Sequence, residues 1–472
     1  MTDDLGQELP LHNIRFEPRV ASILKEIASV ASDSGIPCFL VGGCIRDAIL
    51  NRPVLDIDIV IDQMNSSGID SERFAVLASG SLKGSHPVCF DRFGTHHFVV
   101  SGRGGRVEIE IVSAPLSVTH DFEVGDTSDV MRRDFTVNSL MLGLNVSNFG
   151  RLYDLTGSGL EDTNNRLLRC PLNPSETFTD DPIRMLRAVR LSCTLDFRVD
   201  GSARDFIKQN PQLVANSAAE RQRKELELIL LSDKPAEGFR MLHELGLLRV
   251  IMPGFDSMEG TMQDKRFHSE DVLNHTFSVL ANVEQKDLTT RLAALFHDTG
   301  KPLAKRPKGE RVVFYGHEHI GAEMASRILR SLKFPNSIVK EVAGLVRNHM
   351  INYSEEWTDA AIRRLIKRIG PLLPKQLNLY EADIAALTDA GGLLESAREL
   401  RRRIETIDEK EHVAKIESPL NGREICELLE INPGRLVGEY KARLLDAVLS
   451  GELENEKGAA SEYLRELHAR GI

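Results

Sequence analysis

Residues 39–62, FLVGGCIRDAILNRPVLDIDIVID, decide the fold at the start of this chain. The apolar run that ends before Gly42-Gly43 predicts a strand, and the glycines allow the backbone to approach a ligand closely. A helical turn or two follows over residues 45–50, and Pro53 prevents its continuation. Residues 55–62 then alternate between apolar and mostly acidic positions. This alternation predicts a second strand with one apolar face and one acidic face.

Asp56 and Asp58 point the same way from this strand, about 7 Å apart along it. Two carboxylates at this separation suit a pair of divalent ions, which bridge phosphates and lower the pKa of an attacking hydroxyl. The backbone N–H groups of Gly42-Gly43 could receive phosphate oxygens, and Arg46 supplies positive charge. An Asp-x-Asp pair alone is more often the solvent-facing edge of an ordinary strand. The glycine turn and Arg46-Asp47 just upstream favour catalysis.

Composition places the chain among ordinary soluble proteins of several domains, with 42% hydrophobic and 27% charged residues. No apolar run is long enough to cross a membrane, and the acidic start MTDDLGQELP is not typical of a signal peptide, so we expect a cytoplasmic protein. Six cysteines without a C-x-x-C pair indicate reduced thiols and give little support to a zinc site. A net charge of −11 argues against a non-specific nucleic-acid coat.

Basic residues nevertheless gather locally. Solvated helix faces explain most such runs, whereas several on one side of the protein would form a track for phosphates. The clusters are Arg132-Arg133, Arg184/Arg187/Arg190, Arg221/Arg223/Lys224, Arg363/Arg364/Lys367/Arg368 and Arg401-Arg402-Arg403.

The pattern of the chain changes near residue 165. An amphipathic lead-in helix up to about residue 35 precedes a strand-rich part, and beyond residue 165 nearly every segment has helical periodicity. We therefore expect an α/β head with a mixed β-sheet and helices, followed by a long all-α body.

Residues 130–142, VMRRDFTVNSLML, place charged residues ahead of an expected apolar helix. Arg133 could bind a triphosphate, and Asp134 with Asn138 could position a ribose or cap the helix. A capped helix with an exposed basic start explains this segment equally well. Glu110 is a candidate third carboxylate on a neighbouring strand, although an exposed strand position is the simpler explanation.

Residues 177–191, TFTDDPIRMLRAVRL, predict a helix with Pro182 in its first turn and Asp180 or Asp181 as its cap. Asp181 and Arg184 would share a face at i and i+3. The Asp181 carboxylate, an acceptor, beside the Arg184 guanidinium, which carries several donors, could pair with the edge of a nucleobase. An internal ion pair at the helix start is the alternative.

Together these segments resemble the class II tRNA nucleotidyltransferase and poly(A) polymerase family. By this resemblance, Asp56 and Asp58 bind two Mg²⁺ for nucleotidyl transfer, the RRD element contacts triphosphate and ribose, and Asp181 with Arg184 selects C and A. Arg187 and Arg190 belong to the same nucleotide-binding motif. The matching motifs are GGCIRD (42–47), DID (56–58), RRDFTVNS (132–139), DLTG (154–157), DDPIRMLRAVR (180–190) and ERQRKEL (220–226).

Three positions depart from the family pattern. Asp180 stands where Glu is usual, and Glu424 stands where Asp is usual in the C-terminal segment of bacterial members. Ala114-Pro115 occupies the place where an Arg commonly opens a flexible loop, and the segment up to Asp129 is short. That loop is associated with switching from C to A addition, so its loss raises the prospect of a product that ends at CC.

A second set of metal-binding residue types lies between residues 266 and 385, on separate predicted helices. This part resembles the HD phosphohydrolase domain. The resemblance makes His275, His297, Asp298 and Asp383 the ligands of a divalent metal of unknown identity. His317 and His349 are candidate ligands of a second ion.

The resemblance implies a template-independent nucleotidyltransferase that adds CCA, or only CC, to tRNA from CTP and ATP, with no membrane and no obligatory protein partner. The alternatives are a poly(A) polymerase, a protein acting mainly as an HD phosphohydrolase, and a non-catalytic RNA-binding protein. The expected domains are a catalytic head (1–165), a neck for base selection and RNA binding (166–260), an HD domain (261–390) and a tRNA-binding helical tail (391–472).

Overall fold

The computed structural model describes residues 14–64, 68–90, 94–102, 105–263, 269–308, 311–388 and 390–470. The chain forms two compact units. One contains Met1–Glu225 with Met241–Val250, and the other contains Leu226–Arg240 with Ile251–Ile472. Residues 1–13, at the start of the expected lead-in segment, lie outside the described residues.

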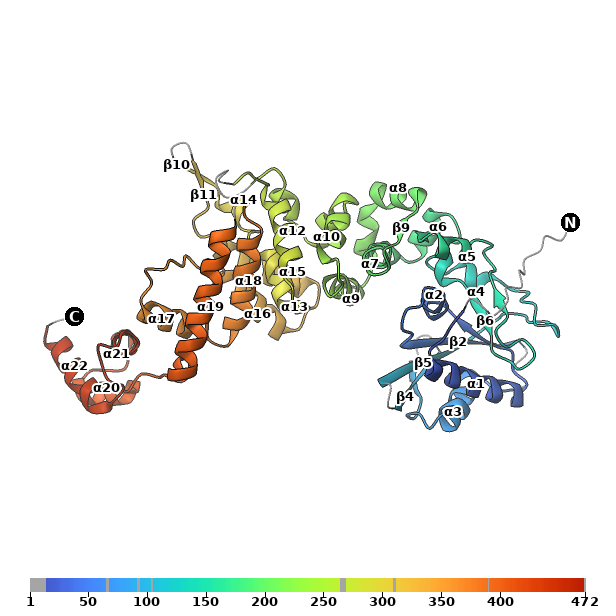
Figure 1. Cartoon of the computed structure of the whole chain (residues 1–472), viewed down its shortest axis with the longest axis horizontal. Helices are drawn as coiled ribbons and strands as arrows, with labels where there is room; N and C mark the ends of the chain where they lie inside the picture. The colour runs from blue at the N-terminus through green and yellow to red at the C-terminus, as the bar shows by residue number, and fades with distance from the viewer. Residues whose placement is uncertain are drawn as a thin grey trace. The chain divides into compact units, whose positions relative to one another are not determined.

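The first unit is built on a mixed sheet with the strand order β3-β4-β5-β2-β1-β6-β7 in the described chain (Figure 1). β2 and β5 run parallel, whereas every other neighbouring pair is antiparallel. The mixed α/β head is therefore confirmed. The strands are β1 (Cys38–Val41), β2 (Asp56–Asp62), β3 (Val88–Phe90), β4 (Thr95–Gly102), β5 (Gly105–Ala114), β6 (Met141–Gly143) and β7 (Leu152–Tyr153).

One face of this sheet is covered by α1 (Pro18–Asp33) and α3 (Ser71–Ser81) (Figure 1). The isoleucines of the alternating β2 segment, Ile57, Ile59 and Ile61, all point into the core under these helices. Because side chains alternate between the faces of a strand, Asp56 and Asp58 point to the opposite face.

The opposite face carries a smaller core, to which Phe39, Val60, Leu116 and Tyr153 contribute. Val60 follows Asp58 by two residues, so the acidic positions and this core share one face of β2. The apolar half of the face is closed by the segment after β5, and the half that carries Asp56 and Asp58 remains open to a pocket.

Asp62 fixes the segment after β5. Its carboxylate is fully buried and accepts hydrogen bonds from the N–H groups of Met64, Leu116, Ser117 and Val118 at 2.9–3.2 Å. The other end of the loop is joined to this anchor, because the N–H groups of residues 125 and 126 both donate to the Leu116 carbonyl. The segment where the family commonly has a flexible loop is thus hydrogen-bonded at both ends here.

Two expectations about helices are wrong. The residues after Asp134 form a 3₁₀ turn, η2 (Thr136–Asn138), and then strand β6, because residues 141–143 pair with β1. Neither Asp180 nor Asp181 caps a helix start: α6 (Pro174–Asp180) ends there, and α7 begins at Arg184 without a side-chain cap.

Helices, a 3₁₀ turn and a short pair of strands complete the first unit. They are α2 (Gly43–Ile49), α4 (Ser128–Met131), α5 (Gly159–Asn164), β8 (Leu167–Leu168), α6, α7 (Arg184–Leu195), β9 (Arg198–Val199), α8 (Gly201–Gln209) and η3 (Pro211–Asn216). α9 (Ala219–Leu230), α10 (Pro235–Glu244) and α11 (Leu247–Ile251) contribute residues to both units.

The second unit is helical in its described part apart from the hairpin β10 (Arg306–Lys308) and β11 (Arg311–Val313), which confirms the all-α body. α12, α13, α15, α16 and α18 pack on one another. Its elements are η4 (Phe255–Met258), α12 (Val272–Asn282), α13 (Leu288–Phe296), α14 (Lys301–Ala304), α15 (His317–Ser331), α16 (Asn336–Arg347), α17 (Asp359–Ile369), η5 (Gly370–Leu372), α18 (Leu373–Ala385), α19 (Gly391–Glu411), η6 (Val413–Lys415), α20 (Gly422–Leu429), α21 (Arg435–Ser450) and α22 (Lys457–Ala469).

Replacing Asp62 by Ala should destabilise the protein strongly, because several backbone N–H groups would lose their shared acceptor. We expect a loss of about 3 kcal/mol in the free energy of unfolding, measured by urea titration. Asp70→Ala is the matched control. It removes an exposed helix cap on α3, which should cost about 1 kcal/mol. Equal losses in the two variants would contradict the anchoring role of Asp62.

Candidate active site and metal centre

Four carboxylates stand in two adjacent rows on the open face of the sheet. In the parallel register of β2 and β5, Asp56 lies beside Glu108 and Asp58 lies beside Glu110. Burial and the neighbouring Glu110 raise the pKa of Asp58 to about 6, and burial and Glu108 raise the pKa of Asp56. These acids repel one another, so the site favours a bound cation.

The glycine turn brings the backbone against this acidic row. Gly42 has a φ of 85°, and a Cβ atom there would lie 3.1 Å from Asp58 Oδ2 and 3.4 Å from Arg133 Nη1. Only glycine combines this conformation with so little space. Because Gly42 has no side chain, its backbone can lie close to both the Asp58 carboxylate and the Arg133 guanidinium.

A buried chain of hydrogen bonds holds the other predicted nucleotide-binding side chains. Arg46 donates to Asp47 and to the Asn138 amide oxygen, and the Asn138 amide donates to Asp134 at 3.0 Å. Asp134 in turn pairs with Arg187 at 2.9 Å. Arg46 is thus engaged by protein partners.

The charged groups in this hydrogen-bonded row stabilise one another. Burial alone would raise the pKa of Asp134, but Arg187, the Asn138 amide and the Phe135 N–H lower it below its usual value. The pKa of Arg187 is raised by Asp134. Asp134 therefore stays ionised as an acceptor.

The two expected base readers have partners other than each other. Both oxygens of Asp181 accept from Arg221, at 2.9 and 2.7 Å. Arg184 donates to the carbonyls of Thr177 and Arg132, at 3.1 and 2.5 Å. The helix break at residues 181–183 explains why the i, i+3 geometry expected for one continuous helix is absent.

One cavity of about 920 Å³ unites these groups, and the predicted catalytic and nucleotide-binding residues line it, whereas the candidate third carboxylate Glu110 is not among its described lining residues. Asp129 and Leu55 also line it and were not predicted as site residues, and Arg132 of the predicted RRD element lines it too. Arg221 belongs to a basic cluster and to the ERQRKEL motif (220–226), but no local signal pointed to its pairing with Asp181. The predicted lining residues are Gly42, Gly43, Arg46, Asp56, Asp58, Arg133, Asp134, Asn138, Asp181, Arg184, Arg187 and Arg190.

A second cluster lies in the helical unit, around the Asp298 carboxylate. Asp298 Oδ2 lies 3.2 Å from His297 Nε2 and 3.9 Å from His275 Nε2, and Asp383 Oδ1 lies 3.0 Å from His275 Nε2. All four expected ligands of the HD site are therefore adjacent. Lys301 also reaches Asp298 Oδ2, at 2.6 Å.

The other oxygen of Asp298 faces the two candidate ligands of a second ion. Asp298 Oδ1 lies 3.4 Å from His317 Nε2 and 3.7 Å from His349 Nε2. The ligand atoms of His275, His297 and Asp298 lie within 4.8 Å of one another, as do those of Asp298, His317 and His349. Asp298 is thus placed between two groups of ligands.

The imidazoles are oriented for coordination through Nε2. The Nδ1 atoms of His297, His317 and His349 each lie 2.7–2.8 Å from a backbone carbonyl three residues earlier. A proton on Nδ1 leaves the lone pair of Nε2 for a metal. Burial and the nearby His297 lower the pKa of His349 to about 4, which keeps this ring neutral.

Three findings from known proteins bear on both sites. The family described as "Poly A polymerase head domain" matches residues 38–169, "Probable RNA and SrmB- binding site of polymerase A" matches 196–259, and "HD domain" matches 267–390. A protein of Thermus thermophilus named CC-adding tRNA nucleotidyltransferase is 33% identical over 92% of this chain and 95% of its own length. This chain belongs to the tRNA nucleotidyltransferase and poly(A) polymerase family.

Other relatives of this family are also similar. A protein of Deinococcus radiodurans named A-adding tRNA nucleotidyltransferase is 34% identical over 71% of this chain and 79% of its own length. The Bacillus stearothermophilus CCA-adding enzyme, solved in complex with CTP, covers 96% of this chain and 99% of its own, with a TM-score of 0.62 and 23% identity. The fold and the nucleotidyltransferase class are thus shared with known members of the family.

Both sites fit the divalent ions that the family implies. In the head, the site offers oxygen donors alone, which suit Mg²⁺. In the HD domain, His297 Nε2 and Asp298 Oδ1 are buried, and their ion-pair neighbours in the described chain, at 3.2 and 3.4 Å, do not meet hydrogen-bond geometry. Such buried polar atoms would otherwise be costly, so a bound ion accounts for them.

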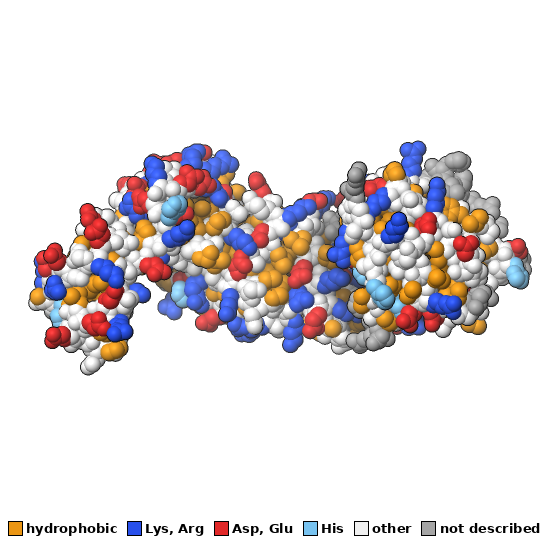
Figure 2. Space-filling view, turned by 90° about the horizontal axis from the view of Figure 1, so that it is seen from below, with side chains coloured by type: hydrophobic (Ala, Val, Ile, Leu, Met, Phe, Trp, Pro, Cys, Tyr) orange, Lys and Arg blue, Asp and Glu red, His pale blue; other side chains and the backbone are white. Residues whose placement is uncertain are grey.

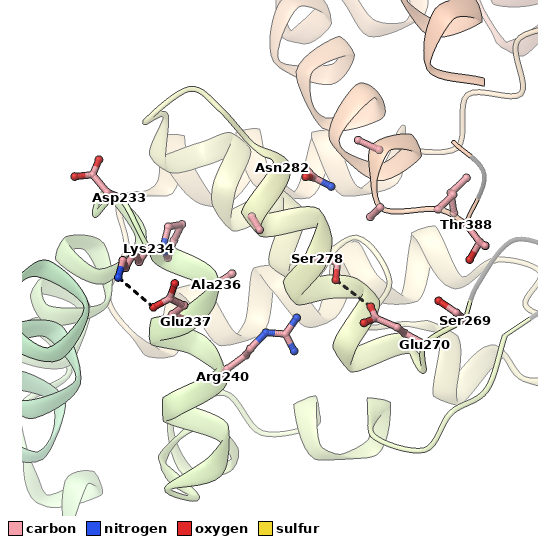
Figure 3. A pocket seen from close by; sticks show the side chains of 15 residues that line it. Asp233, Lys234, Ala236, Glu237, Arg240, Ser269, Glu270, Ser278, Asn282 and Thr388 are labelled. Atoms are coloured by element: carbon pink, nitrogen blue, oxygen red, sulfur yellow. Dashed lines mark hydrogen bonds and ion pairs between the residues drawn. The ribbon is translucent and has the colours of Figure 1, made fainter. Parts of the chain in front are cut away.

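A further cavity of about 660 Å³ lies in the helical unit (Figure 3). Lys234 pairs with Glu237, and Ser278 donates to Glu270. Arg240 donates to Asn274 and stacks on Phe277. The described residues that line this cavity include none of the HD ligands.

Basic clusters in the helical body are largely ion-paired. Arg363 pairs with Glu411 and Arg364 with Asp446, and Arg401, Arg402 and Arg403 each contact an acid. Figure 2 shows acidic and basic side chains interspersed over the visible face of the body. These clusters therefore match solvated helix faces better than a phosphate track. In the described chain, no helix is long and apolar enough to span a membrane.

Asp58→Asn should stabilise the metal-free protein while abolishing nucleotide transfer. The folded-state pKa of Asp58, about 6, lies above its ordinary value of 3.8, so keeping the carboxylate ionised costs stability above about pH 6. That cost disappears below about pH 4, where the folded and unfolded states are both protonated. We expect a gain of about 2 kcal/mol at about pH 8 and no gain at about pH 4.

Urea titration at both pH values in the presence of a chelator measures this difference. Asp33→Asn, which changes an exposed acid on α1, is the control and should give no gain at either pH. A gain for Asp58→Asn that does not depend on pH would contradict the assignment.

Proposed function

We propose that this chain adds cytidine to the 3′ end of tRNA from CTP and stops after the second cytidine of the CCA end. The observation that carries this proposal is the single cavity that joins the acidic pair, the glycine turn and the expected base readers. The Thermus thermophilus relative, similar over nearly the whole chain, is named as a CC-adding enzyme. Addition of all of CCA, which would also use ATP, is the alternative.

The fixed loop supports the shorter product. Residues 116–118 are held by the buried Asp62, and the segment begins at Ala114-Pro115 instead of an arginine. In the family, loss of a flexible loop at this point accompanies products that lack the terminal A. A loop anchored at both ends disfavours the rearrangement that a change of base would need.

In the proposed reaction, the residues of the head divide into three tasks. Asp56 and Asp58, with Glu110 adjacent, would hold two Mg²⁺, which lower the pKa of the RNA 3′-hydroxyl and neutralise the departing pyrophosphate. The N–H groups of Gly42-Gly43 and the guanidinium of Arg133 would bind and orient the triphosphate. The third task is alignment: the residues around the cavity would place the 3′-hydroxyl opposite the α-phosphate, and this positioning would supply much of the rate increase.

Base choice would fall to Asp181 and Arg184, which face the cavity without a nucleic-acid template. The Asp181 carboxylate accepts from an exocyclic amine, which cytosine carries and uracil lacks. Arg184 donates to ring acceptors. A poly(A) polymerase uses similar motifs, and incorporation of C from CTP separates it from this proposal.

Sequencing of tRNA 3′ ends after reaction tests the product. A transcript that lacks CCA, incubated with CTP and ATP, should end in CC, and a transcript that already ends in CC should not accept A. Asp56→Asn should lower the rate at least about 10³-fold, because the site loses a charged ligand. Terminal A on either transcript would show that the chain completes CCA.

We propose a second activity for the HD domain, hydrolysis of phosphomonoesters or cyclic phosphates by bound divalent metal. The favouring observation is the set of His275, His297, Asp298 and Asp383, with His317 and His349 on the other side of Asp298. Oriented imidazoles and a carboxylate between two ligand groups suit activation of a water.

Asp298→Ala should abolish this hydrolysis and spare nucleotide addition, because it removes the group shared by both sets of ligands. Hydrolysis of p-nitrophenyl phosphate and of a 2′,3′-cyclic nucleotide, with Mg²⁺, Mn²⁺ or Ni²⁺ added, is the measurement. His319→Ala, an exposed imidazole on α15, is the matched control and should leave both activities unchanged. Hydrolysis that persists in Asp298→Ala would contradict the proposal that the HD site catalyses it.

The same proposal assigns tasks to the parts of the chain. The head (1–165) is catalytic, the neck (166–260) selects the base and binds RNA, and the HD domain (261–390) hydrolyses phosphoesters. The helical tail (391–472) would bind tRNA mainly by its shape. A cytoplasmic location would place the enzyme with these substrates.

A further inference from the structure

The partner of Asp181 comes from the ERQRKEL segment (220–226), to which the sequence assigned no contact with Asp181. Two guanidinium nitrogens of Arg221, Nη1 and Nη2, donate to it, one to each carboxylate oxygen, at 2.9 and 2.7 Å. Arg221 lies in the first turn of α9 and is half exposed, and it is absent from the described lining of the cavity. It therefore reaches the cavity only through Asp181.

Arg221 projects from a helix start that is itself fixed. The side-chain amide of the next residue, Gln222, is buried and donates to the carbonyls of Val214 and Ser217, at 3.1 and 2.9 Å. Near the opposite end of this stretch, Glu225 pairs with Arg190 at 2.6 Å. The guanidinium is thus presented from a fixed piece of backbone.

The other arginines of the cavity are engaged elsewhere. Arg184 donates to two backbone carbonyls, and Arg187 pairs with Asp134. Among the described residues, Arg221 alone is recorded as donating to the Asp181 side chain. The orientation of this carboxylate therefore depends on Arg221.

We propose that Arg221 is a positioning residue that sets the discrimination between CTP and UTP by fixing the plane of the Asp181 carboxylate. This inference rests on the proposed role of Asp181 in base selection. A bidentate guanidinium takes one lone pair from each oxygen and holds the group in plane, and it leaves the second lone pair of each oxygen for another donor.

A fixed carboxylate distinguishes cytosine from uracil because its contact with one base is attractive and its contact with the other is repulsive. Cytosine presents an amine donor at position 4, where uracil presents a carbonyl oxygen. A carboxylate held in place accepts from the amine and repels the carbonyl, whereas a mobile one can turn away from uracil. Specificity from a polar group requires that the group cannot turn away from the unfavourable contact.

Steady-state kinetics on the full-length chain test this proposal, with CTP and UTP as separate substrates and a tRNA transcript that lacks CCA. We expect Arg221→Ala to lower the ratio of kcat/KM for CTP over UTP by about tenfold, with most of the change in the KM for CTP. Arg221→Lys, which offers a single point of charge, should give an intermediate ratio.

Arg204→Ala is the matched control. Arg204 makes an exposed ion pair of the same kind in the same unit, with Glu244 at 2.7 Å, and its loss should leave the ratio unchanged. Thermal unfolding curves for every variant identify any general loss of folding. Equal losses for CTP and UTP in Arg221→Ala, or no change in the ratio, would overturn the proposal.

Asp181→Asn separates this inference from the proposed function. If Asp181→Asn keeps the preference for CTP, the base-reading role of Asp181 is wrong, and the role proposed for Arg221 is wrong as well. If Asp181→Asn loses the preference while Arg221→Ala keeps it, the proposed function stands and only this inference is wrong. The double variant should be no less selective than Asp181→Asn, because Arg221 acts through Asp181.

Discussion

Repulsion between carboxylates on adjacent parallel strands is the constraint on which the head depends. The register of β2 and β5 places Asp56 beside Glu108 and Asp58 beside Glu110, and burial makes their charges more costly. A fold that maximised its own stability would separate such acids. Keeping them together gives a site that cations and a triphosphate would complete under the proposed function, so part of the protein's stability would be exchanged for binding.

The same principle recurs in the helical unit with other donors. Asp298 lies among imidazoles whose Nδ1 atoms face backbone carbonyls, which leaves their Nε2 atoms directed at the centre of the cluster. His297 Nε2 and Asp298 Oδ1 are buried there without a hydrogen bond in the described chain. In both units, then, polar groups that a stable core would satisfy internally are left available to a ligand.

Around the head site, ion pairs hold the functional side chains in place. Arg46, Asn138, Asp134 and Arg187 form one connected chain, and Arg221 holds Asp181 at the other side of the cavity. Such networks orient each group before a nucleotide arrives. Pre-organised donors and acceptors stabilise developing charge without the cost of reorganisation during the reaction.

The sequence alone determined the glycine turn, the acidic strand, the α/β-then-helical order and most of the residues of both sites, because these follow from local periodicity and from motifs that resemble a known family. Only the tertiary structure decided what those residues contact. The strand β6 in place of a helix, the burial of Asp62 and the pairing of Arg221 with Asp181 each depend on partners 40 or more residues away in the sequence. A single sequence carries no local signal for such contacts, since the energy that selects them comes from packing and from charges brought together by the fold.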